Sequence, residues 1–408
     1  MKTLYCLGLD VAKHKLRAAL CGSAGAILFE ADLPVSAGGR AELLALLRAR
    51  VPQPEQLLVV LEATGVLHLN WSAALAQAGY AVVVINPLIA RRFYPIENAL
   101  RDSKTDPIDA RGLCALGLLH GEKLLCKYRF QLEPERLALQ RLQTVRKALR
   151  TSLTNLKKTY TSLLDLSFPE LGQLLEVDGT GIRALLQKAP TPGAIAQKRL
   201  STLEKDWKLR PKAAPLKALA ADSLADPELA AAGAPALQAI LQSIAALEAQ
   251  LRALDKQIEA RASQGPLAQS KALLETIPGF GPTLATKVLA YLPHEILHSG
   301  SRRQAAARLQ AFMGNEPRLQ ESGQWKGQTK MSKRGVEPLR TAFFQAAFSA
   351  SQSDPELRSY YLRKRAQAKC HHLALTHLMR ILTRRMVAVL RSQQPYQPKE
   401  VAPLRVAA

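Results

Sequence analysis

The chain has 408 residues, of which 56 are lysine or arginine and 33 are aspartate or glutamate, so the formal net charge is +23. Because 48% of the residues are hydrophobic, the composition is that of a folded protein and excludes a wholly disordered chain. So large a positive surplus predicts a polyanionic partner, either a nucleic acid or an anionic membrane. No apolar run reaches the roughly 18–20 residues of a membrane span, so we expect no membrane partner.

The N-terminal residues and the cysteines indicate a cytoplasmic protein. The opening sequence MKTLYCLGLD reaches an acidic residue too early for a signal peptide. The chain has an odd number of cysteines with no CxxC spacing, which is untypical of a disulfide framework or a zinc ribbon. We therefore expect reduced thiols in a cytosolic protein. The cysteines are Cys6, Cys21, Cys114, Cys126 and Cys370.

The first 125 residues or so alternate between strand and helix patterns. TLYCLGLDVA, KLRAALC and AILFEADLP are closely spaced apolar runs, which favour an antiparallel meander. GGRAELLALLRARV has helical periodicity, LLVVLEATG reads as a buried strand, and a helix separates it from a third strand at YAVVVINP. The prediction is a mixed sheet covered by helices.

Two long helices follow in the pattern. One runs from Glu133 to about Leu166, and the other carries apolar residues at alternating steps of three and four from Leu237 to Ile258. This heptad seam is typical of a coiled coil and favours a dimerisation stalk, with helix packing inside one chain as the alternative. Between the helices lies a Pro/Ala-rich insert, at about 168–233, without a strong pattern.

The last third contains candidate phosphate contacts. LLETIPGFGPTLATKVLAYL predicts a helix-hairpin-helix in which the backbone of Gly279 and Gly281 approaches a phosphate. From Leu357 to Lys399 there are ten lysines and arginines and no acid, which favours phosphate contact over a solvated face. Further candidate nucleic-acid-binding residues are Lys333, Arg334, Arg380, Arg384 and Arg385.

Four carboxylates have positions that suit metal chemistry. Asp10 and Glu62 each end an apolar strand, at the sheet edge where functional sites of α/β proteins lie. Asp106 and Asp109 are three residues apart at the start of a helix, so they share one helix face. Converging carboxylates suit Mg²⁺, and two such ions can drive a phosphodiester displacement. The alternatives are an N-cap at Asp106, which precedes a proline, and strand-end ion pairs for the others.

The arrangement resembles the RuvC-like, RNase H-type fold. More closely, the chain resembles the DEDD transposases of bacterial insertion sequences, which combine a RuvC-like domain with a catalytic serine. The matching motifs are GLDVAKHKL, LEATG, DSKTDPIDAR, IPGFGPTLA, GNEPRLQESG and SKRGVEPLRTAFFQAA. They occur in the family's order, over roughly 1–125 and 270–350.

That resemblance implies specific roles and partners. Asp10, Glu62, Asp106 and Asp109 would hold Mg²⁺, and Ser322 would join covalently to DNA. It further implies a structured guide RNA and a homo-oligomer, dimer or tetramer, in which the acids of one protomer face the serine of another. One departure is Gly314-Asn315-Glu316-Pro317, where family members often carry a more compact Gly-Leu-x-Pro, and the long 168–233 insert is another.

The residues alone leave the nucleophile open. A Ser-Gly pair in a basic loop is usually a turn, and no His or Asp in a triad relation is visible. Mg²⁺ chemistry needs no histidine base, however. Ser332 is the rival nucleophile, but its place before Lys333 and Arg334 favours a helix cap or a phosphate contact.

We therefore expect an α/β plus α protein in three parts and a tail. The parts are a RuvC-like DEDD domain at 1–130, a coiled-coil stalk at 131–265 that contains the insert, a mostly helical serine-bearing domain at 266–395, and the tail at 396–408. The expected function is Mg²⁺-dependent transposition of DNA through a phosphoserine intermediate. The expected location is the bacterial cytoplasm, in association with the nucleoid. The alternatives are a RuvC-like Holliday-junction or structure-specific nuclease without a covalent intermediate, and a nucleoid- or RNA-binding protein with degenerate acids.

Overall fold

The computed structural model describes residues 4–63, 65–87, 90, 106–205, 209–318, 321–322, 325–326, 330–367 and 369–398. Only the backbone is described at 106–108, 127, 318, 321–322, 325–326 and 330. The chain forms two compact units, Met1–Pro134 with Pro293–Ala305 and Glu135–Leu292 with Ala306–Ala408. Dividing the second unit into a stalk and a serine-bearing domain stays a prediction.

The first unit is built on a five-stranded mixed sheet with the strand order β3-β2-β1-β4-β5. β1, β2 and β3 form an antiparallel meander, and β4 and β5 run parallel to β1. This confirms the predicted mixed α/β sheet. The strands are β1 (Tyr5–Val11), β2 (Lys15–Gly22), β3 (Ile27–Pro34), β4 (Leu57–Glu62) and β5 (Ala81–Ile85).

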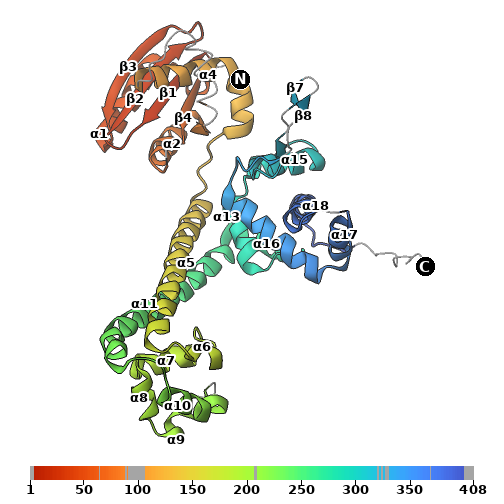
Figure 1. Ribbon diagram of the computed structural model, residues 1–408. Coiled ribbons are helices and arrows are strands. Elements are labelled where there is room, and N and C mark those ends of the chain that lie inside the picture. The colour runs from red at the N-terminus through yellow and green to blue at the C-terminus, as the bar shows by residue number, and fades with distance from the viewer. Residues whose placement is uncertain are drawn as a thin grey trace, which may run out of the picture. The chain divides into compact units, whose positions relative to one another are not determined.

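Helices cover both faces of the sheet (Figure 1). α1 (Ala37–Arg50) and α2 (His68–Gln77) pack on one face, where Leu43 and Trp71 join a core with Leu7 and Leu9 of β1. α4 (Asp106–Tyr128) packs on the other face, where Leu113 joins strand residues of β4 and β5. Because both faces are covered, the central strands are apolar at nearly every position instead of alternating. The 3₁₀ turn η1 (Pro54–Gln56) precedes β4, and α14 (His294–His298) packs against α4.

Two glycines allow α4 to lie directly on β1. A Cβ atom at Gly8 would overlap the carbonyl oxygen of Ala110, and one at Gly117 would overlap the sulfur of Cys6. Ala110, near the start of α4, therefore contacts Gly8, whereas Gly117, two turns later in the helix, contacts Cys6, which is earlier in β1. α4 is antiparallel to β1, and its first turn lies toward the carboxyl end of that strand.

The second unit contains two long antiparallel helices, α5 (Pro134–Ser167) and α11 (Pro227–Ala262) (Figure 1). The start of α5 packs on the end of α11, where Leu139 contacts the cluster that holds Ile258, and Arg146 lies 2.5 Å from Asp255. At the other end Tyr160 joins the cluster that holds Ile244. The heptad seam of α11 is thus buried against α5 of the same chain, as in the alternative interpretation, and a dimerisation stalk stays a prediction.

α11 is also long and apolar enough to cross a membrane by length and composition, contrary to our expectation that no segment would be. Its apolar seam residues, including Leu237, Ile240 and Ile244, lie in the core shared with α5. Packing within the chain therefore accounts for the apolar seam, while 28% of the most apolar 18-residue window of the helix is buried.

The insert between the long helices folds into a group of short helices around Phe168, Leu171, Ile182 and Leu216, which are buried. No pattern in the sequence predicted this core, because each helix is too short for its periodicity to be recognised. The elements are α6 (Leu171–Leu174), α7 (Thr180–Lys188), α8 (Pro192–Ala196), α9 (Leu200–Leu203), η2 (Arg210–Lys212) and α10 (Ala213–Ala221).

The rest of the second unit is mostly helical and is centred on α16, which packs against α13 and α18. At its core the ring of Phe343 meets Phe280 edge-on, with centroids 5.3 Å apart. The helices are η3 (Gly265–Leu267), α12 (Ala268–Glu275), α13 (Pro282–Tyr291), α15 (Arg302–Phe312), α16 (Glu337–Ser353), α17 (Pro355–Ala366) and α18 (His371–Ser392). The first residues of α15, up to Ala305, belong to the first unit. Two short ladders, β6 (Pro317–Arg318) with β9 (Lys330–Met331) and β7 (Glu321–Ser322) with β8 (Trp325–Lys326), lie between α15 and α16.

Candidate active site and nucleic-acid interface

Asp10 and Glu62 lie side by side at the carboxyl ends of two parallel strands. In the β1–β4 register Leu9 is opposite Leu61, so the next position on each strand carries one of the acids. Both acids are half-buried. They share the sheet face of Gly8 and Val60, which is the face that α4 covers.

The first turn of α4 is at the same edge. Asp109 is half-buried and directly precedes Ala110, whose carbonyl oxygen contacts Gly8, two residues before Asp10. Asp106 is the first residue of α4, and only its backbone is described. Among the described side chains no three His, Cys, Asp or Glu residues form a group that could hold a metal ion, and the side chain of Asp106 is outside that set.

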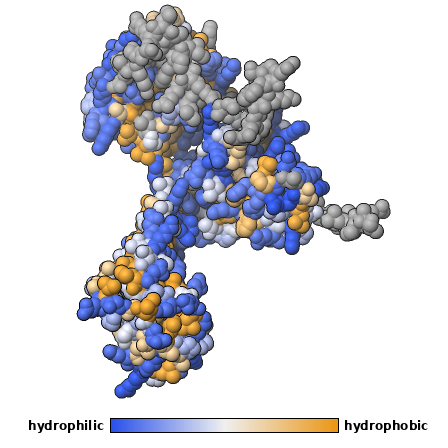
Figure 2. All heavy atoms as spheres, in the orientation of Figure 1, coloured by the Kyte–Doolittle hydropathy of each residue, from blue (hydrophilic) through white to orange (hydrophobic). Residues whose placement is uncertain are grey.

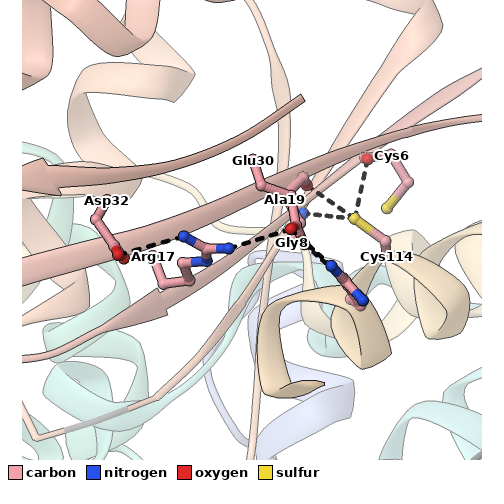
Figure 3. A network of polar contacts seen from close by, with 8 residues as sticks. Cys6, Gly8, Arg17, Ala19, Glu30, Asp32 and Cys114 are labelled. Atoms are coloured by element: carbon pink, nitrogen blue, oxygen red, sulfur yellow. Dashed lines mark hydrogen bonds and ion pairs between the residues drawn. The ribbon is translucent and has the colours of Figure 1, made fainter. Parts of the chain in front are cut away.

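An ion-pair network ties this end of α4 to the meander (Figure 3). The guanidinium of Arg111 donates to both carboxylate oxygens of Glu30 on β3, at 2.5 and 2.7 Å. Arg17 on β2, which is opposite Asp10 in the register, donates to Glu30 at 3.1 Å and lies 3.3 Å from Asp32. The hydrogen bond from Arg111 holds the pKa of Glu30 below its ordinary value, so Glu30 stays charged and the clamp persists at neutral pH.

A buried thiol completes the attachment of α4 to the sheet (Figure 3). The sulfur of Cys114 accepts a hydrogen bond from the backbone N–H of Gly8 at 3.1 Å and lies 2.9 Å from the carbonyl oxygen of Ala19. The interaction with Cys21 lowers the pKa of Cys114, but the hydrogen bond with Cys6 and burial outweigh it and raise the pKa. Cys114 is therefore a neutral structural group, and all five cysteines are free thiols.

The two candidate serines differ in their surroundings. Ser322 is in β7, in register with Trp325 of β8, and only its backbone is described. Ser332 belongs to a turn in which its hydroxyl oxygen accepts a hydrogen bond from the backbone N–H of Arg334 at 3.2 Å. Its own N–H donates to the carbonyl oxygen of Glu316 at 2.9 Å. Ser332 thus has a turn-forming role, but it does not cap α16, whose N-cap residue is Val336. Its expected phosphate contact stays a prediction.

The predicted basic contacts divide into two groups. Arg380 and Arg384 are exposed and one turn apart on α18, as phosphate contacts would require. Arg385 instead donates to Asp354 and Glu356, each at 2.5 Å, and its side chain is only 9% exposed. Because its charge is paired inside the protein, Arg385 has a structural role, and its contact with nucleic acid stays a prediction. Lys333 and Arg334 are exposed beside the Ser332 turn.

Gly279 is explained by packing. Its φ of 96° is in the left-handed region, and a Cβ atom there would overlap the carbonyl oxygen of Ala346 on α16. Gly281 is exposed at the start of α13, with no neighbour near an added Cβ. The helix-hairpin-helix, with its phosphate contact through these glycines, stays a prediction.

Sequence reasoning missed the residues that position α4. The glycine inside the apolar run of β1, Gly8, is the usual sign of close backbone approach, and Gly117 gives the same sign on the helix. Arg111 is two residues after Asp109, so it could have been noted as a candidate clamp. Its partner Glu30 is 81 residues away in sequence, and nothing in the local pattern identifies it.

Comparison with known families agrees with this arrangement. Residues 7–169 match the model of the IS110-type DEDD transposase domain, described as a transposase. Residues 271–362 match the model described as "Transposase IS116/IS110/IS902 family". The two matches together cover more than half of the chain, which therefore belongs to the IS110/IS116/IS902 family of transposases.

Individual relatives are insertion-element proteins that are themselves described as uncharacterized. The chain is 28% identical to a 43.6 kDa protein of insertion element IS110 from Streptomyces coelicolor, over 64% of each chain. It is 30% identical to a 42 kDa protein of IS900 from Mycobacterium paratuberculosis, over 39% of this chain and 38% of the relative. A 44.8 kDa protein of IS116 from Streptomyces clavuligerus is 27% identical, over 52% of this chain and 53% of the relative. The chain thus spans less than two thirds of the length of each of these relatives.

Proposed function

We propose that this protein is a DNA transposase that cleaves and joins strands at a metal-dependent carboxylate site, through a covalent bond between Ser322 and DNA. The observation that carries the proposal is the common sheet edge of Asp10, Glu62 and the first turn of α4, in a chain of the transposase family. Its net charge of +23 suits a polyanionic substrate.

The four acids form an all-carboxylate donor set, which fits a hard divalent cation such as Mg²⁺ and does not suit a softer, thiolate-binding metal. Asp10, Glu62, Asp106 and Asp109 would hold the metal. When bound, Mg²⁺ would supply Lewis acidity at the scissile phosphate. The Arg111–Glu30 clamp and the Gly8–Ala110 contact would fix the distance between the acids on the strands and those on the helix.

The serine step exchanges one phosphoester bond for another. The Oγ atom of Ser322 attacks the scissile phosphorus, the P–O bond to one deoxyribose breaks, and the freed deoxyribose oxygen takes up a proton. The serine proton passes to solvent. The hydroxyl group of a second strand later attacks the phosphorus and gives up its proton to solvent. The bond between phosphorus and the serine Oγ then breaks, and the serine oxygen takes up a proton. Because each step trades one phosphoester for another, no ATP is consumed.

The proposal includes the partners that the resemblance implies. These are donor and target DNA, a structured guide RNA, and a homo-oligomer that pairs the acids of one protomer with the serine of another. The exposed side chains of Lys333, Arg334, Arg380 and Arg384 would contact phosphates. Sequencing the RNA that copurifies with the protein tests the guide directly.

The decisive test is a denaturing gel for a protein–DNA adduct. We expect wild type to form the adduct with Mg²⁺ and the copurified RNA, and Ser322→Ala to form none while it retains nucleic-acid binding. Ser332→Ala is the matched control and should form the adduct, because the Ser332 hydroxyl is hydrogen-bonded to the backbone N–H of Arg334 within its own turn.

Two outcomes would contradict the serine assignment. If Ser322→Ala still formed the adduct and Ser332→Ala did not, the nucleophile would be Ser332. If wild type cleaved DNA with Mg²⁺ but never formed an adduct, water would be the nucleophile and the protein would be a RuvC-like nuclease.

A further inference from the structure

A group of aromatic and histidine rings lies where α16, α17 and α18 pack together (Figure 1). The ring of Phe344 stacks on His372, with centroids 5.4 Å apart and planes 22° apart. One turn further along α16, Phe348 meets His371 edge-on at 6.0 Å. Tyr361 of α17 holds His371 through a 2.8 Å hydrogen bond between its hydroxyl and Nδ1. We call these five residues the stacking cluster.

The cluster is at the surface and is not part of the core. Phe348 is 46% exposed and His372 is exposed, whereas Phe343 on the same helix is fully buried against Phe280. α16 therefore buries one phenylalanine and presents another to solvent. Figure 2 shows hydrophobic residues interspersed among hydrophilic ones on this C-terminal part of the surface. A partner that covers aromatic rings would recover their exposed apolar area.

The surroundings of the cluster are strongly basic. Lys364, Arg365 and Lys369 are at the junction of α17 and α18, directly before His371, and none of them is ion-paired with an acid among the described residues. The acids at the start of α17, Asp354 and Glu356, are already paired with Arg385.

The positive charge here is dense enough to act on a neighbouring titratable group. Burial lowers the pKa of His377, and the charges of Lys364, Arg380 and Lys369 lower it further. Lys364, Lys369 and Arg380 therefore all lie within electrostatic reach of His377.

We propose that the stacking cluster binds an unpaired nucleic-acid strand, whose bases stack on Phe348, Phe344 and His372 while its phosphates meet Lys364, Arg365 and Lys369. The strand must be unpaired, because the faces of bases inside a duplex are covered by their neighbours and cannot reach an aromatic ring. Alternation of stacking rings with cations is the usual construction of single-strand sites. This inference rests on the proposed action on nucleic acid, but not on metal binding or on Ser322.

The test is a fluorescence-anisotropy titration of the full chain, without metal and with EDTA. The probes are labelled oligothymidine and oligouridine of about 12 nucleotides and a DNA duplex of similar length. We expect Phe348→Ala to weaken binding of the unpaired probes by about 5- to 100-fold and duplex binding by less than about twofold. Comparison of the DNA and RNA probes tells which kind of strand the site prefers.

A second variant makes the stacking directly visible. Phe348→Trp should bind the unpaired probes at least as tightly as wild type, and its added indole fluorescence should be quenched by oligothymidine. Leu229→Ala, at a leucine that is 55% exposed on α11, is the control for loss of exposed apolar area and should leave all affinities unchanged.

Three results would overturn the inference. In the first, Phe348→Ala weakens binding of the duplex and of the unpaired probes equally. In the second, it weakens binding of neither. In the third, sedimentation shows a shift in oligomeric state without a change in affinity, which would make the cluster a contact between copies of the chain. Because the titration needs no metal, a failure here is distinguishable from a failure of the adduct assay.

Discussion

Gly8 of β1 and Ala110 of α4 meet so closely that a Cβ atom on the glycine would overlap the alanine carbonyl oxygen. This contact sets both the distance and the direction of α4 on the sheet. Because α4 runs antiparallel to β1, the same contact brings the first helical turn, with Asp106 and Asp109, to the strand ends that carry Asp10 and Glu62. One missing side chain thus fixes the geometry of the candidate metal site.

Gly8→Ala should therefore damage stability and activity together. The new methyl group meets backbone atoms that cannot rotate away, so α4 must shift, at a cost of about 1–3 kcal/mol in the free energy of unfolding. Chemical denaturation monitored by circular dichroism measures this loss. Gly38→Ala is the control, because Gly38 is exposed in α1 with no close neighbour, and it should be neutral or slightly stabilising.

The acids on α4 give a prediction that separates metal binding from helix capping. Asp106→Asn and Asp109→Asn each remove a charge but little volume, and each should lower the rate of strand cleavage by at least about 100-fold while DNA binding persists. Asp32→Asn, which changes a half-exposed carboxylate of the Arg17 network, should keep most of the activity. If Asp106 is only an N-cap, asparagine substitutes well, and cleavage within a few-fold of wild type would contradict its metal role.

The two kinds of arginine on α18 should respond differently to neutralisation. Changing both Arg380 and Arg384 to Gln should flatten the dependence of log affinity on log salt concentration by up to about 0.9 per lost contact with duplex DNA. Binding titrations at several salt concentrations measure the slope, and an unchanged slope would mean that these side chains face only solvent.

Arg385→Gln should act on stability instead. It leaves Asp354, which is 8% exposed, without its charge partner, so we expect a loss of about 3–5 kcal/mol in the free energy of unfolding. Denaturation curves of the variant measure this loss. A variant that folds as stably as wild type but has a flatter salt slope would support the predicted contact of Arg385 with nucleic acid and contradict its structural role.

The clamp between Glu30 and Arg111 predicts a pH dependence of stability. The hydrogen bond with Arg111 lowers the folded-state pKa of Glu30 below its ordinary value of 4.5, so the unfolded state binds the proton more readily. The stabilisation is present above about pH 4.5 and is lost as the pH falls through the lower, folded-state pKa. Glu30→Gln should be less stable than wild type at pH 7, and the difference should shrink below pH 4.5. Glu42→Gln, which removes an exposed carboxylate on α1, is the control and should be as stable as wild type at pH 7.

Some features of this protein are determined by local sequence. Continuous apolar runs that end in Asp10 and Glu62 identify buried strands and place both acids at strand ends, because a strand covered by helices on both faces must be apolar until it emerges. The step pattern of α11 likewise identifies which residues form its buried seam, since a helix repeats every 3.6 residues. Motif order was sufficient to indicate the transposase family.

Only the tertiary structure shows which residues contact these strands, helices and charged side chains. Periodicity reveals an apolar face but not its partner, and the seam of α11 is covered by α5 of the same chain. Charge composition counts Arg385 among free cations, yet folding brings it to Asp354, 31 residues earlier in the chain. The sequence around Gly279 predicts a phosphate contact, and only the folded structure shows that this glycine also allows close packing on α16. In each case the contact joins residues that are distant in sequence. Such a contact forms only when the whole chain folds, so no local sequence pattern can reveal it.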